Sequence, residues 1–242
     1  MAAEEQHGSK VYDYFERMDE IMRKALNPVQ NPLKEEFLYK KVEHEGKIVE
    51  NMARTYHCEK LKHISLSKLV VHGVVQSHNF SIFPDGNYDL PFFGTDIVIF
   101  DKMIVCFCDL QPYIRDEESV QKYINPMKPL YEKYKHIPNE MPRGRDWLAE
   151  ISSNFGISVT TTDVSYVEES FRGAMEYFQL FTTYLKKAEP VKDPKRKEEI
   201  RKGREHVIAM YTEYDPGYGP MKKYFGKEWT DYYFHNILFA GA

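Results

Sequence analysis

The spacing of hydrophobic positions changes along the chain and separates helix-forming from strand-forming stretches. Residues 10–26 place apolar side chains three and four positions apart, as at Val11, Phe15 and Met18, which predicts an amphipathic helix. From residue 36 to residue 110 the pattern becomes short apolar runs bounded by turn residues, which predicts strands. We expect these strands at residues 36–44, 47–57, 62–72, 74–83, 92–100 and 103–110.

The predicted strands follow one another through short polar turns, such as Pro84-Asp85-Gly86, so the sheet should be an antiparallel meander. In the fourth to sixth strands, apolar residues point to both faces, which requires cover on both sides. We expect covering helices at residues 118–135, 167–187, 194–213 and 219–238, and one more strand at 156–162. These elements predict an α/β fold, a three-layer α/β/α sandwich with a central, mainly antiparallel sheet, forming one domain over residues 1–242.

Composition narrows the class of protein. Hydrophobic residues make up 42% of the 242 residues, enough for a substantial core, and the net charge of −4 gives no reason to expect nucleic acid as a partner. No apolar run approaches the ~20 residues that span a bilayer, and the first residues resemble neither a signal peptide nor an Arg-rich transit peptide. Cys58, Cys106 and Cys108 are too few for a disulfide framework. We expect them to be reduced and buried, in an intracellular compartment.

Two polar residues interrupt an otherwise apolar hairpin. If it pivots near Asn87 and Tyr88, Asn79 and Asp96 lie opposite each other on one face, about 5 Å apart at Cβ. A bulge at Gly94 would shift the register and separate them. A carboxylate at the centre of a doubly covered strand is costly to bury, and a functional acid with a raised pKa would explain its presence. A structural carboxylate bonded to backbone amides would fit the same pattern.

Other candidate residues carry weaker signals. Asp215 precedes Pro and Gly, and alone this pattern indicates a turn residue whose side chain bonds local backbone. The nine histidines show no metal-ligand spacing, so we expect no metal site. The chain has no G-x-G-x-x-G, G-x-x-x-x-G-K-[ST] or G-x-S-x-G motif. Residues 186–204 hold nine Lys and Arg against four Asp and Glu, which indicates a solvated helix face or a surface for an acidic protein.

Several separated motifs resemble the ferredoxin-dependent bilin reductases over residues 35–239. They are Asn-Phe-Ser-Ile-Phe-Pro at 79–84, Tyr-Asp-Leu-Pro-Phe-Phe-Gly-Thr-Asp-Ile-Val at 88–98, Asp-Leu-Gln-Pro at 109–112, the run from Asp215 to Thr230, and Tyr-Phe-His-Asn-Ile-Leu-Phe at 233–239. The resemblance implies an α/β/α sandwich that binds an open-chain tetrapyrrole between the sheet and the C-terminal helices. It also implies single electrons from [2Fe-2S] ferredoxin, with no bound metal, flavin or nicotinamide.

The resemblance also assigns roles to particular residues. Asp96 and Asp215 match the two acidic proton donors of the family, and Asn79 matches the polar group beside the first. Gly217-Tyr218 replaces a segment that usually holds an Arg, so one substrate contact of the family is missing here. Asn at position 79 and the 88–94 string favour members that reduce 15,16-dihydrobiliverdin to phycoerythrobilin at the A-ring diene. We expect Asp215 to protonate the A-ring side of the bilin. We expect Asp96 and Asn79 to handle the other proton and to contact the lactam end.

Two alternatives remain open at this point. The chain could instead reduce biliverdin, stopping at 15,16-dihydrobiliverdin or completing a four-electron route, or it could be a non-catalytic bilin carrier. The resemblance further implies ferredoxin and an upstream bilin reductase as partners, with residues 186–204 as the docking surface for ferredoxin. We expect a monomer in the plastid stroma of a eukaryote or the cytoplasm of a cyanobacterium.

Overall fold

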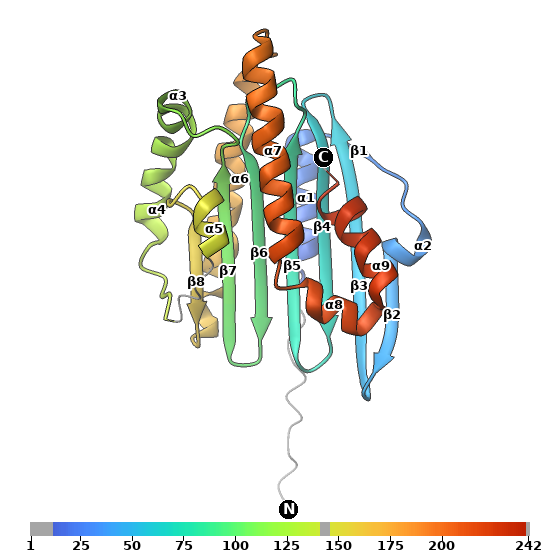
Figure 1. The fold of residues 1–242 in the computed structure, drawn as a ribbon. Helices are drawn as coiled ribbons and strands as arrows, with labels where there is room; N and C mark the ends of the chain where they lie inside the picture. The colour runs from blue at the N-terminus through green and yellow to red at the C-terminus, as the bar shows by residue number, and fades with distance from the viewer. Residues whose placement is uncertain (1–11, 141–145, 241–242) are drawn as a thin grey trace, which may run out of the picture.

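One antiparallel sheet with helices on both faces makes up the protein, as a computed structural model that describes residues 12–140 and 146–240 shows (Figure 1). The strands are β1 (Val29–Gln30), β2 (Tyr39–His44), β3 (Lys47–Cys58), β4 (Leu61–Val71), β5 (Val75–Pro84), β6 (Phe92–Phe100), β7 (Met103–Gln111) and β8 (Ile157–Thr161). Their order is β1-β3-β4-β5-β6-β7-β8, and β2 also pairs with β3. The predicted three-layer sandwich around an antiparallel sheet is confirmed.

The helices follow the same chain order. They are α1 (Tyr14–Leu26), α2 (Glu35–Leu38), α3 (Glu117–Ser119), α4 (Lys128–Tyr134), α5 (Asp146–Ile151), α6 (Val167–Lys187), α7 (Pro194–Tyr214), α8 (Tyr218–Phe225) and α9 (Lys227–Tyr233). Short π- and 3-10-helical turns are η1 (Val120–Ile124), η2 (Asn125–Met127), η3 (Val164–Tyr166) and η4 (Phe234–Leu238). None of the described helices is long and apolar enough to span a membrane.

The two faces of the sheet are covered by different helices (Figure 1). Helices α1 and α6 pack on one face, over an apolar cluster that includes Phe80, Phe93 and Phe178. Helices α5, α7, α8 and α9 lie over the other face, where a second cluster includes Phe83 and Phe92. Because neighbouring strand residues point to opposite faces, Phe92 and Phe93 enter different clusters, as the apolar pattern of this strand predicts.

Three predicted elements are wrong in detail, each for a local reason. The predicted strand 36–44 begins only at Tyr39, because α2 turns first and buries Phe37, whose ring stacks 4.7 Å from that of Tyr232. The predicted helix 118–135 is divided into α3, η1, η2 and α4, since prolines within it cannot donate a backbone hydrogen bond. The predicted helix 219–238 breaks at Gly226, whose φ of 85° favours glycine.

The cysteines follow the prediction only in part. Cys106 and Cys108 are buried on the α6 face, where burial raises the pKa of the Cys106 thiol. Cys58 is partly exposed, so the prediction that all three are buried is wrong there, because Cys58 ends β3 at its turn. All three are free thiols. The first two residues of the predicted helix 10–26 lie outside the described residues, and α1 begins at Tyr14.

Candidate active site

The hairpin of β5 and β6 brings Asn79 and Asp96 together. These two residues are direct partners in the antiparallel register, as predicted. The register continues without a shift to Ser81 and Gly94, so Gly94 does not separate them. Both side chains therefore project from the same face, the one covered by α5 and α7, and both are partly buried.

Two serines on the same face of β5 hold this pair. The Ser77 hydroxyl donates a hydrogen bond to Asp96 Oδ1 at 3.0 Å, and the Ser81 hydroxyl donates to Asn79 Oδ1 at 3.0 Å. With its carbonyl oxygen taken by Ser81, the Asn79 amide offers its N–H₂ group as a donor. A carboxyl group and a hydrogen-bond donor thus stand side by side on the sheet.

Asp215 reaches the same place from another element. It lies directly after α7, and its Oδ1 accepts a hydrogen bond from the Gly217 amide at 2.7 Å. The turn geometry expected from Asp-Pro-Gly is therefore present. Asp215 also lines one small cavity, of about 40 Å³, together with Asn79 and Asp96. The three predicted site residues are brought together.

Aromatic side chains contribute five of the thirteen residues that line this cavity. Phe92 and Phe107 come from the sheet, and the cover is Trp147 of α5, Tyr211 of α7 and Phe239. The Tyr211 ring stacks on Phe239 at 5.4 Å and meets Trp147 edge to face at 5.4 Å. Flat aromatic walls around polar groups suit a conjugated, planar ligand.

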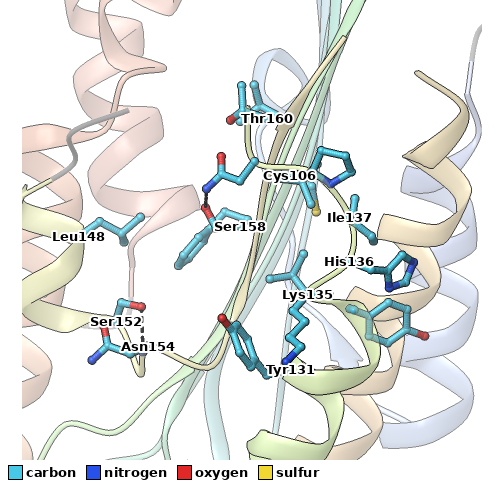
Figure 2. A pocket seen from close by; sticks show the side chains of 18 of the residues that line it. Cys106, Tyr131, Lys135, His136, Ile137, Leu148, Ser152, Asn154, Ser158 and Thr160 are labelled. Carbon is cyan, nitrogen blue, oxygen red and sulfur yellow. Dashed lines mark hydrogen bonds between the residues drawn. The ribbon is translucent and has the colours of Figure 1, made fainter. Parts of the chain in front are cut away.

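A larger cavity of about 500 Å³ lies at the edge strand β8 (Figure 2). Its polar side chains include Ser152, Ser158 and Lys135, and no Asp or Glu belongs to its described lining. Phe107 and Leu148 line both this cavity and the smaller one. Of these two neighbouring cavities, only the smaller one has acid groups in its described lining, so the candidate active site is the one around Asp96.

Cations and metal ligands are scarce near the acids. Among the residues described, neither Lys nor Arg lines the small cavity. Gly217 and Tyr218 lie just after Asp215, and the Tyr218 hydroxyl donates to Asp231. Within residues 12–140 and 146–240, no three His, Cys, Asp or Glu side chains are arranged to hold a metal ion.

Sequence reasoning missed several residues of the site. Ser77 and Ser81 flank Asn79 at a spacing of two, so the alternation of a strand could have identified them. Phe239 ends the 233–239 motif. No sequence signal identifies Trp147, because α5 falls in a stretch where no element was predicted.

Two carboxyl groups and a carboxamide inside an aromatic cavity define a site that can give protons to a flat conjugated molecule. Comparison with known proteins agrees with this class. The model of the ferredoxin-dependent bilin reductase family matches residues 15–240, and the chain belongs to this family. It is therefore an enzyme, a ferredoxin-dependent bilin oxidoreductase.

Relatives include enzymes for more than one reduction. The chain is 28% identical to phycoerythrobilin:ferredoxin oxidoreductase of Gloeobacter violaceus over 231 residues, covering 93% of each chain. It is 30% identical to the enzyme of the same name from Nostoc punctiforme, covering 80% of this chain and 78% of that one. It is 27% identical to 15,16-dihydrobiliverdin:ferredoxin oxidoreductase of Nostoc punctiforme, covering 77% of each.

A solved structure has the same fold. The crystal structure of tomato phytochromobilin synthase in complex with biliverdin matches with a TM-score of 0.82. The match covers 95% of this chain and 83% of that chain, at 16% sequence identity. The sandwich predicted from the sequence is thus the fold of a bilin-binding enzyme.

Proposed function

We propose that the chain reduces 15,16-dihydrobiliverdin to phycoerythrobilin at the A-ring diene, using two electrons from ferredoxin. The observation that carries this proposal is the meeting of Asp96, Asn79 and Asp215 in one aromatic cavity. The similar proteins of Gloeobacter violaceus and Nostoc punctiforme that match over most of the chain include phycoerythrobilin:ferredoxin oxidoreductases, which favours this step over the earlier reduction of biliverdin.

The reaction needs one proton for each electron. A first electron from ferredoxin makes the bilin a radical anion, which is basic and takes a proton from a carboxylic acid. A second electron and a second proton complete the reduction of one double bond, and two ferredoxins are oxidised. Asp215 gives the proton on the A-ring side. Asp96, which accepts a hydrogen bond from Ser77 and lies opposite Asn79, gives the other, and Asn79 donates to the lactam end.

The aromatic cover must move for the bilin to bind. A pocket for a ligand of this size has a volume of roughly 300 Å³ or more, whereas the cavity at the acids is about 40 Å³. Trp147 and Tyr211 fill the space above the acids, and they are carried by two helices that contact each other. Their displacement would let the bilin lie on the sheet beneath the same rings.

Ferredoxin docks, in this proposal, on the basic stretch of residues 186–204. Lys195, Arg201 and Lys202 of α7 are exposed there. Arg196 is not available, because it is largely buried between Asp89 and Asp116. The exposed cations and Tyr211 belong to one helix, and Arg201 lies ten residues, about 15 Å, from Tyr211. An acidic partner on this stretch would therefore stand close to the bilin.

Further properties follow from the same proposal. We propose that the chain binds no redox cofactor of its own, since it has no dinucleotide or P-loop motif. The substrate would come from an upstream bilin reductase. The enzyme would act as a monomer wherever reduced ferredoxin is found, in a plastid stroma or a cyanobacterial cytoplasm.

Anaerobic turnover of the purified chain with reduced ferredoxin tests the proposal. Biliverdin and 15,16-dihydrobiliverdin are offered separately, and the absorbance spectrum identifies each product. We expect rapid loss of 15,16-dihydrobiliverdin and formation of phycoerythrobilin, with no reaction when ferredoxin is omitted. Rapid consumption of biliverdin with no reaction of dihydrobiliverdin would show that the chain serves the earlier step. Bilin binding with no reaction of either pigment would identify a carrier.

A further inference from the structure

The Asp-Leu-Gln-Pro motif at residues 109–112 holds two polar side chains that the chemistry does not use. Asp109 and Gln111 point from β7 toward the helices that cover the acids, and neither has any exposed surface. A buried polar group is costly unless it forms hydrogen bonds. The hydrogen-bond partners of these two side chains therefore indicate their structural role.

Asp109 ties the end of α5 to the sheet. Its Oδ2 accepts hydrogen bonds from the Ser152 hydroxyl at 3.0 Å and from the Ser153 amide at 2.7 Å. The Ser153 hydroxyl donates to the other oxygen, Oδ1. Helix α5 ends at Ile151, directly before these serines. Gly156 allows the close approach, because a Cβ there would lie 2.9 Å from Asp109 Cγ.

Gln111 contacts the other covering helix. Its Oε1 accepts a hydrogen bond from the Tyr211 hydroxyl of α7 at 3.3 Å. Gln111 Nε2 is buried and has no hydrogen-bond partner among the described residues. This bond fixes a ring that lines the acid cavity and contacts Phe92, Trp147 and Phe239.

The two anchors converge on one pair of rings. Asp109 holds α5, which carries Trp147, and Gln111 holds Tyr211, and these rings meet directly above the acids. We infer that Asp109 and Gln111 are positioning residues that fix the aromatic cover, Trp147 and Tyr211, over Asp96 and Asn79. The expected effect on turnover rests on the proposed function. The expected effect on how firmly Trp147 and Tyr211 are held does not.

The cover sets the plane of the bilin relative to the acids. A conjugated ligand beneath loosely held rings would lie at variable distances from Asp96, so proton transfer should suffer more than binding. Losing one hydrogen bond corresponds to about three- to tenfold in rate. We therefore expect kcat to fall. Because the cover must be displaced before the bilin binds, looser anchors should not raise KM for the bilin.

Gln111→Met and Tyr211→Phe test this inference, because both remove the same hydrogen bond at nearly constant volume. Acrylamide quenching of tryptophan fluorescence, without bilin, reports the cover. The other tryptophan, Trp229, is 7% exposed and serves as a shielded background. We expect stronger quenching in both variants, a three- to tenfold lower kcat, and a double variant no worse than the poorer single one.

Tyr14→Phe is the matched control, since it removes one hydroxyl bond to Glu168 on the opposite face of the sheet. It should leave quenching and kcat unchanged. The milder Asp109→Asn should increase quenching as Gln111→Met does. Unchanged quenching in both Gln111→Met and Tyr211→Phe, or rate losses that multiply in the double variant, would overturn the inference. The quenching result stands even if another bilin proves to be the substrate.

Discussion

The two faces of the sheet are built from the same strands but differ in what their side chains do. The face under α1 and α6 is a mainly apolar layer in which Phe80 and Phe93 pack against Phe178. The face under α5, α7, α8 and α9 is interrupted at its centre by Asn79 and Asp96. The alternation of strands allows this separation, because consecutive residues serve opposite faces. Stability and chemistry can therefore be altered independently.

Asp96→Asn should have the largest effect on the acid face. The variant keeps the size of the side chain and an oxygen for the Ser77 hydroxyl, but it cannot give a proton. We expect kcat to fall about 10²- to 10⁴-fold, with bilin binding preserved. Turnover is measured anaerobically with reduced ferredoxin, and binding by absorbance titration. Asp215→Asn should behave in the same way.

Asp101→Asn is the control for these variants, because Asp101 is exposed in the turn between β6 and β7. Its turnover should equal that of the unaltered chain. Turnover of Asp96→Asn or Asp215→Asn within twofold of the unaltered chain would reject the corresponding carboxyl group as a proton donor.

Phe178→Ala should have the opposite effect: it should lower stability and leave turnover nearly unchanged. Phe178 has no exposed surface and contacts the rings of Phe80 and Phe93 at 5.2 and 5.8 Å. Its truncation leaves a cavity in the apolar layer and should lower the free energy of unfolding by about 3–5 kcal/mol. Urea denaturation measures this loss. Turnover per folded molecule should change little, and a loss of kcat as large as that of Asp96→Asn would show that the faces are coupled.

His78 makes the stability of the apolar face depend on pH. Burial lowers its pKa to about 3, with a smaller contribution from Lys68. In the unfolded chain His78 has a pKa near 6.5, so it takes up a proton as the pH falls below this value. In the folded chain His78 stays neutral until the pH approaches 3. Stability should therefore fall as the pH drops through this window, by about 2 kcal/mol at pH 5. Urea denaturation of His78→Leu between pH 7 and 5 should show a flatter dependence.

Asp109 on the other face acts in the opposite direction. Burial raises its pKa to about 6, so between about pH 4 and 6 the folded chain holds a proton more readily than the unfolded chain. Its contribution to stability should therefore increase as the pH falls through this range. Asp109→Asn should make the loss of stability at falling pH steeper, whereas His78→Leu should make it shallower. The same pH dependence in both variants would contradict these assignments.

Much of the fold and part of the site could be predicted, because alternation and turn residues are local signals. They gave the register of Asn79 and Asp96 and a sheet covered on both faces. The meeting of Asp215 with this pair followed only from family resemblance, since nothing local relates a turn after α7 to β5. The positions of Trp147 and Tyr211 depend on contacts between distant elements, such as the bond from Tyr211 to Gln111. No pattern along the chain encodes them.

Charge reversal on α7 should have the smallest effect, and it should change only the interaction with ferredoxin. Lys195→Glu and Lys202→Glu change exposed side chains, and exposed charges contribute about 0–1 kcal/mol to stability. We expect KM for ferredoxin to rise two- to tenfold for each, and this difference to shrink as salt screens the charges. Lys24→Glu, an equally exposed reversal on α1, is the control and should change nothing. If all three variants have the same KM for ferredoxin, the partner docks elsewhere, and the basic half of α7 is only a solvated surface.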